Sequence, residues 1–134
     1  AMVLILSMAV GLTAGLDLGI GSRGIVITRG IAEATRLGAA LGAHPQTFAG
    51  LAGVGDLVSC ATHEDHPSFA TGLSLARGGR CPVRFVKDAQ AVLHLADRSG
   101  VDMPLTAAVA AIASGQLAPR LAFDSLMRRE ARAE

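Results

Sequence analysis

The stretch SRGIVITRGIAEATRLGAAL, residues 22–41, decides the fold class because its apolar residues recur at helical spacing. The residues that form this stripe are Ile27, Ile31, Ala34, Gly38 and Leu41. Spacings of three and four place them on one face of a helix. Gly42 follows at the position where a glycine commonly ends a helix. The pattern therefore predicts a helix over residues 22–41, and we expect it at the centre of the domain.

Charged residues of the same stretch share a second helical face. Arg29, Glu33 and Arg36 are separated by four and three positions, which allows them to form ion pairs along the helix. We interpret this face as solvent-exposed and ion-paired.

The rest of the chain repeats helical patterns between residues that start or end helices. Further helices are expected over residues 68–76 and 83–100, and others follow the prolines. The residues that punctuate the pattern are Pro45, Gly100, Pro104, Gly115 and Pro119. A series of alternating strands is absent from the sequence pattern. The sequence predicts an all-α, compact multi-helix fold in which residues 1–134 form a single domain.

Composition narrows the functional classes. Hydrophobic residues make up 51% of the 134 residues but aromatic residues only 3%, so the core must consist of small aliphatic side chains. The net charge of +1 and the scarcity of aromatic rings argue against nucleic-acid binding. Two cysteines do not make a disulfide framework, which favours a cytoplasmic location.

The first 16 residues, AMVLILSMAVGLTAGL, carry no charged side chain. The run is shorter than the roughly 20 apolar residues that span a bilayer. A secretory signal would place Lys or Arg before the apolar run, and none stands there. We interpret the segment as a buried helix or core strand, and we expect no membrane association.

The stretch GIGSRG, residues 19–24, matches the G-x-G-x-x-G pattern of dinucleotide-binding loops. That loop requires a strand before it, a helix after it and an acidic residue about 20 positions on. No Asp or Glu lies near residues 41–45. We therefore favour a glycine-rich link between two packed helices and expect no coenzyme to bind to this chain alone.

The stretch CATHEDHP, residues 60–67, brings together residue types that bind zinc. Cys60, His63 and His66 could supply three ligands, and Cys81 or a water molecule the fourth. Polar loops also contain such residues by chance, and we favour that interpretation over a metal site. A cysteine–histidine nucleophilic pair is disfavoured because no third group that would orient the histidine can be identified.

The stretch LAGVGDLVSCAT, residues 51–62, places one carboxylate, Asp56, in apolar surroundings. Together with ITRGIAEATRLGAALGAHPQTFAG before it and ADRSGVDMPLTAAV after it, the stretch resembles the C-terminal domain of bacterial NAD(P)-dependent glycerol-3-phosphate dehydrogenase. The resemblance covers nearly the whole chain from Gly11 on. It implies an all-helical substrate domain, similar to the C-terminal domain of 6-phosphogluconate dehydrogenase, that follows a coenzyme-binding Rossmann domain.

The resemblance also implies roles for particular positions. Asp56 occupies the place of an active-site aspartate that orients the substrate, so it is our catalytic candidate. The family's phosphate-holding run falls on residues 66–68, which makes His66 and Ser68 the candidate substrate-binding residues. The reaction implied is the interconversion of glycerol 3-phosphate and dihydroxyacetone phosphate with NAD(P), with a Rossmann domain as partner.

Several positions depart from the family pattern. The family's catalytic lysine and the asparagine after it fall at Val3 and Leu4, and its arginine and asparagine at Pro67 and Ser68. The other departures are Ala14, Ile20, Gly21, Cys60, and the coenzyme-facing positions Val83, Arg84 and Phe85. We therefore expect this chain by itself to be inactive.

The domain arrangement of the family also implies an uncovered surface. We expect residues 2–12 to expose an apolar strip and the chain to form a homo-oligomer. Two alternative functions remain: a non-catalytic helical interaction module and a small metal-binding domain.

Overall fold

The computed structural model describes residues 2–44, 46, 55, 59 and 65–133. No strand occurs among these residues, and the helices whose bounds are defined are α1 (Met2–Gly15), α2 (Gly19–Ala40), α5 (Pro67–Ala76), α6 (Val83–Arg98), α7 (Pro104–Ala113) and α8 (Pro119–Ala133). The all-α prediction is confirmed. Among the described helices, none is both long enough and apolar enough to cross a bilayer.

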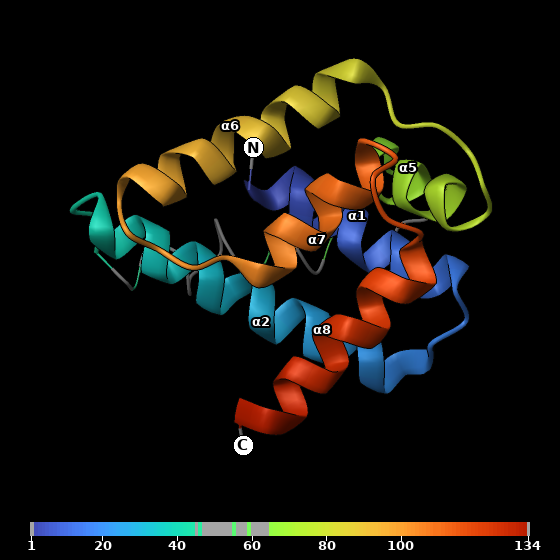
Figure 1. The fold of residues 1–134 in the computed structure, drawn as a ribbon, viewed down its shortest axis with the longest axis horizontal. Helices are drawn as coiled ribbons and strands as arrows, with labels where there is room; N and C mark the ends of the chain where they lie inside the picture. The colour runs from blue at the N-terminus through green and yellow to red at the C-terminus, as the bar shows by residue number, and fades with distance from the viewer. Residues whose placement is uncertain (1, 45, 47–54, 56–58, 60–64, 134) are drawn as a thin grey trace.

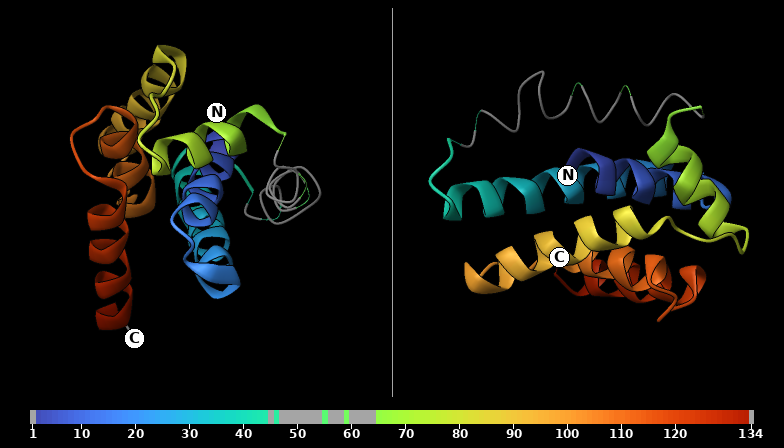
Figure 2. Two further views of the ribbon diagram at one scale, coloured as in Figure 1. Left: turned by 90° about the vertical axis from the view of Figure 1, so that its right-hand side faces the viewer. Right: turned by 90° about the horizontal axis from the view of Figure 1, so that it is seen from above.

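The helices form two layers. One layer contains α1, α2 and α5, and the other contains α6, α7 and α8 (Figures 1 and 2). Contacts of α1 with α6 and α7, and of α2 with α7, join the two layers. The hydrophobic core lies between them.

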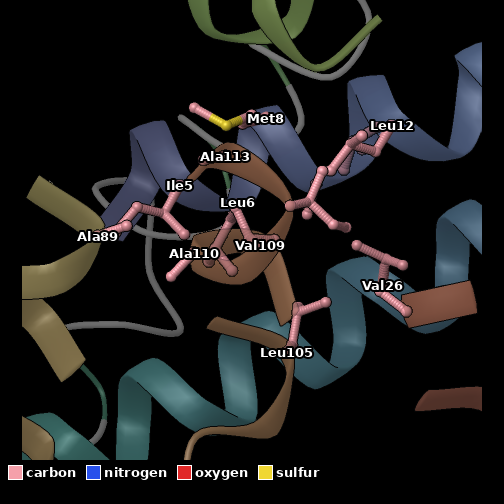
Figure 3. Close-up of a cluster of buried hydrophobic side chains, with 14 of the residues drawn as sticks. Ile5, Leu6, Met8, Leu12, Val26, Ala89, Leu105, Val109, Ala110 and Ala113 are labelled. Atoms are coloured by element: carbon pink, nitrogen blue, oxygen red, sulfur yellow. The ribbon is translucent and has the colours of Figure 1, made fainter. Parts of the chain in front are cut away.

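Helix α1 is the central helix of the fold. Every residue from Ile5 to Thr13 is buried, and Figure 3 shows Ile5 and Leu6 beside the α7 residues Val109 and Ala110. Two predictions are therefore wrong: α2 is not the centre, and residues 2–12 do not form an exposed strip. The reason is charge: α1 has no ionisable side chain, so it can be enclosed on all sides, whereas α2 carries exposed polar positions.

Helix α2 begins three residues earlier than predicted and contains the whole GIGSRG stretch. Gly19 is its first residue, and residues 19–24 form its first turns. The element before it is the helix α1 rather than a strand. The stretch is therefore neither a strand-to-helix coenzyme loop nor a link between helices.

Five of the described helices end in the same hydrogen-bonding arrangement. In each, a residue with positive φ donates its N–H to the carbonyl three positions back, and the next N–H reaches the carbonyl five positions back. The positive-φ residues are Asp17, Gly42, Gly78, Gly100 and Gly115. Gly42, Gly100 and Gly115 stand where the sequence predicted helix ends. Asp17, with φ of 55°, is the one non-glycine residue among them.

Prolines begin three of the helices that the structure describes. Pro67, Pro104 and Pro119 are the first residues of α5, α7 and α8, where a missing N–H is not needed for helical hydrogen bonding. The prediction for Pro45 lies outside the described residues.

Candidate functional site

Glycines allow α5 to pack directly on the backbone of α1. A Cβ at Gly11 would overlap the carbonyl group of Phe69, and a Cβ at Gly72 would overlap the carbonyl oxygen of Met8. The two helices pack more extensively than any other pair in the described part of the chain. This close approach fixes the start of α5, and with it His66 and Ser68, beside the middle of α1.

His66 is the N-cap of α5. Its Nδ1 accepts a hydrogen bond from the Ser68 N–H at 3.3 Å, and its backbone has an extended conformation with φ of −65° and ψ of 131°. Accepting this bond requires Nδ1 to carry no proton, so the remaining ring proton of the neutral side chain is on Nε2. The ring is half-buried, and Nε2 is the atom that it can offer as a donor to an anion.

Ser68 is almost completely buried, with 1% of its surface exposed. Within the described part of the chain, its hydroxyl has no hydrogen-bond partner, and the same holds for the buried hydroxyl of Ser7 on α1. A buried hydroxyl without a partner is unfavourable by about 1–3 kcal/mol. The predicted role of Ser68 in substrate binding stays a prediction, and the unsatisfied hydroxyl is a polar group available at this site.

Of the other residues of the predicted site, the structure describes Val3 but not Asp56 or Cys60. Val3 is half-buried near the start of α1 and has no proton or charge to contribute. Asp56 and Cys60 lie outside the described residues. The structure therefore places His66 and Ser68 at the start of α5 and Val3 near the start of α1, and leaves the role of Asp56 a prediction.

The positions expected to face a coenzyme differ in their exposure to solvent. Val83 is 68% exposed at the first turn of α6, whereas Phe85 is buried in the core. The guanidinium of Arg84 lies over the Phe85 ring, 5.3 Å from its centroid. The resemblance noted in the sequence implies a glycine at the position of Phe85, and a buried phenyl ring there removes the close backbone approach that a glycine permits.

The metal hypothesis involves residues both inside and outside the described part. Cys60 and His63 lie outside it, and no group of three or more possible ligands occurs within it. Cys81 is half-buried and donates to the Pro82 carbonyl oxygen at 3.5 Å. Burial raises the pKa of the Cys81 thiol, which disfavours the thiolate that a metal requires.

Glu33 on α2 is a buried polar side chain whose carboxylate accepts three hydrogen bonds. It is fully buried, and its carboxylate receives the backbone N–H of Leu105 at 2.7 Å and that of Thr106 at 3.1 Å. The Thr106 hydroxyl donates to the same oxygen as the Thr106 N–H, at 3.0 Å. The expectation that Glu33 lies on a solvated, ion-paired face is wrong, because its carboxylate instead caps the N-terminus of α7.

The surroundings of Glu33 have opposing effects on its ionisation. Burial raises the pKa of Glu33 above 4.5, and the three hydrogen bonds and the charge of Arg36 lower it, with burial the larger effect. Arg36 itself is exposed and donates to the Asp102 carbonyl oxygen at 3.0 Å. These contacts join α2 to the segment that begins α7.

One signal in the sequence pointed toward this contact. The N-cap residue of α7 is Met103, whose side chain makes no capping hydrogen bond. A helix that begins in the core without its own cap needs an acceptor from elsewhere. Pattern analysis along one helix could not identify Glu33 as that acceptor, because 72 residues separate it from Leu105.

Comparison with known proteins identifies the family. A family model described as NAD-dependent glycerol-3-phosphate dehydrogenase C-terminus matches residues 2–124. Glycerol-3-phosphate dehydrogenase [NAD(P)+] of Leptothrix cholodnii is 48% identical, over 97% of this chain and 41% of the relative. The enzyme of that name from Methylibium petroleiphilum is 45% identical, over 97% of this chain and 42% of the relative.

A solved structure gives the same result. The crystal structure of glycerol-3-phosphate dehydrogenase from Coxiella burnetii has a TM-score of 0.86 with this chain and is 32% identical. The match covers 94% of this chain and 42% of that one, so the chain spans less than half the length of the proteins that it resembles. The chain belongs to the family of NAD-dependent glycerol-3-phosphate dehydrogenase C-terminal domains.

Proposed function

We propose that this chain serves as the substrate-side domain of an NAD(P)-linked glycerol-3-phosphate dehydrogenase and that the 134 residues alone are inactive. The observation that carries the proposal is the match of residues 2–124 to the family's C-terminal domain. The coenzyme, bound by a separate Rossmann domain, would supply or receive the hydride. This chain would hold the substrate.

The proposed roles follow from the chemistry of each side chain. Asp56 would accept hydrogen bonds from substrate hydroxyl groups and orient the carbon that exchanges hydride. His66 would donate from Nε2 to the phosphate group, because its Nδ1 accepts the Ser68 N–H. The Ser68 hydroxyl has no partner among the described residues and would contribute a second donor.

The position of Val3 limits the expected rate. Negative charge develops on the substrate oxygen during hydride transfer, and a proton donor or a cation there stabilises it. Val3 offers neither. Losing one such group lowers rates by about 10²- to 10⁴-fold, so we expect no detectable turnover even with a related Rossmann domain supplied in trans.

The test combines the chain, that Rossmann domain, NADH and dihydroxyacetone phosphate, with NADH absorbance as the readout. We expect the unmodified chain to show background rates. A variant carrying Val3→Lys, Pro67→Arg and Ser68→Asn should gain turnover, and adding Asp56→Asn to that variant should abolish the gain. Turnover by the unmodified chain that is lost on Asp56→Asn would contradict the predicted inactivity, and a triple variant that folds but stays inert would contradict the proposed site.

A second function, helical association, is supported by exposed apolar side chains. Ile20 at the start of α2 is 87% exposed, and Leu121 on α8 is 64% exposed. These residues replace the strip at residues 2–12 as the candidates for a homo-oligomer contact. Light scattering should show a dimer or larger assembly that Ile20→Ser or Leu121→Ser weakens. A monomer at high protein concentration would contradict it.

A further inference from the structure

A cleft lies where the end of α1, the start of α2 and the end of α5 meet. Its volume is about 480 Å³, and its lining includes Asp17, Gly19, Arg23, Leu73 and Arg77. Neither His66 nor Ser68 lines it, so it is separate from the start of α5 where we place the substrate.

Two guanidinium groups from different helices line the cleft. Arg23 belongs to the second turn of α2, and Arg77 is the residue that ends α5. Across residues 2–44 and 65–128, neither forms an ion pair with a carboxylate. Guanidinium groups bind oxyanions well because they present several N–H donors in a plane.

Arg23 is held in place before any ligand binds. Its guanidinium lies over the Phe69 ring of α5, 5.8 Å from the ring centroid, and its side chain is half-buried. Stacking on an aromatic ring restricts the rotamers of an arginine. Less conformational entropy is then lost when the guanidinium binds an anion.

The backbone at the start of α2 adds donors to the same place. The N-cap residue Leu18 makes no side-chain capping bond, so the first N–H groups of α2 are not capped by it. Gly19 lines the cleft and no heavy atom lies within 4 Å of its Cβ position, so a ligand can approach the backbone there. The positive end of the helix dipole favours an anion at this point.

We propose that this cleft binds an oxyanion, with a phosphate group as the chemical class, between Arg23 and Arg77 at the start of α2. Asp17 lines the same cleft and carries negative charge. Its carboxylate therefore opposes the anion, and Asp17 sets an upper limit on the affinity. The two arginines therefore strengthen binding of the anion, and Asp17 weakens it.

The experiment is a titration of the 134-residue chain with inorganic phosphate at low ionic strength, followed by amide NMR shifts. We expect saturable shifts at residues 17–24 and around Arg77. Arg23→Gln and Arg77→Gln should each weaken binding by about three- to tenfold, as expected for a partly exposed ion pair. Asp17→Asn should tighten binding by about two- to fivefold, because it removes the negative charge that opposes the anion. Asparagine also tolerates the positive φ of this position, so the helix end should be kept.

Matched variants separate a site from general attraction. Arg128→Gln removes one exposed positive charge on α8 and should leave the phosphate affinity unchanged. Titration with a phosphate monoester, compared with inorganic phosphate, distinguishes two ligands. Equal affinity indicates that the cleft holds the free ion, and tighter binding of the monoester indicates that it holds the phosphate group of a larger molecule. Absence of saturable shifts, equal weakening by Arg128→Gln and Arg23→Gln, or weaker binding by Asp17→Asn would overturn the proposal.

Discussion

The carboxylate of Glu33 on α2 caps α7 by accepting the Leu105 N–H at 2.7 Å. The two residues are 72 positions apart, and this bond, with two more from Thr106 to the same carboxylate, joins α2 to α7 across the two layers. The bond also places a fully buried acid in a core of aliphatic side chains. Several properties of the protein should depend on this contact.

Removing the Glu33 carboxylate should destabilise the fold strongly. Glu33→Ala leaves the N–H groups of Leu105 and Thr106 buried without an acceptor, and we expect a loss of about 3 kcal/mol or more in the free energy of unfolding. Glu33→Gln retains one oxygen but turns an amide toward a donor, with a loss of about 2 kcal/mol. Urea denaturation below the raised pKa of Glu33, where its contribution is still present, measures both. Asp97→Asn, an exposed acid on α6, should change stability by less than about 0.5 kcal/mol, and an equal effect of the two acids would contradict the capping role.

The stability provided by Glu33 should decrease as pH rises. Burial raises the pKa of Glu33 above its ordinary value of 4.5. Between the ordinary pKa of the unfolded chain and the raised pKa of the folded chain, the folded state binds a proton more tightly than the unfolded state. The contribution is therefore fully present below about pH 4.5 and is lost as pH rises through the raised pKa. The stability difference between the unmodified chain and Glu33→Gln should shrink over this window in urea titrations. A difference that grows with pH would show that the hydrogen bonds outweigh burial.

Asp17→Gly should stabilise the protein by about 0.5–1 kcal/mol. Asp17 has a φ of 55°, where four other helix ends of the described chain have glycine. Glycine removes the steric penalty of the left-handed conformation, and its larger entropy in the unfolded chain offsets part of the gain. The reverse substitution at Gly100, Gly100→Asp, should destabilise by a similar amount. Thermal unfolding of both variants checks this, and destabilisation by Asp17→Gly would indicate that the carboxylate makes a stabilising contact.

Gly72→Ala should destabilise the α1–α5 contact. The new Cβ would overlap the Met8 carbonyl oxygen, so the two helices would have to move apart. Overpacking of this kind is unfavourable by about 1–3 kcal/mol. Gly24→Ala is the matched control, because it adds the same methyl group to a helix where no atom lies within 4 Å of it. It should stabilise by about 0.5–1 kcal/mol through helix propensity. Equal effects at both positions would contradict the close packing.

The sequence by itself determined the helical class and the ends of most helices. Apolar residues at spacings of three and four, prolines such as Pro104 and glycines such as Gly100 act over one or two turns, so their effects can be predicted locally. The family resemblance was also present in the sequence, in runs such as LAGVGDL. The coarse identity of the chain therefore required no coordinates.

Only the tertiary structure decided which helix is central and where the buried charge goes. The sequence indicates that the first 16 residues form a buried helix or core strand, and the place of α1 as the central helix depends on which neighbours surround it. Glu33 has the local pattern of a surface residue because the spacing of Arg29 and Arg36 suggests ion pairs. Its actual partners, Leu105 and Thr106, come close only after α7 packs on α2. Contacts between residues distant in sequence depend on the packing of whole helices, and local periodicity carries no information about that packing.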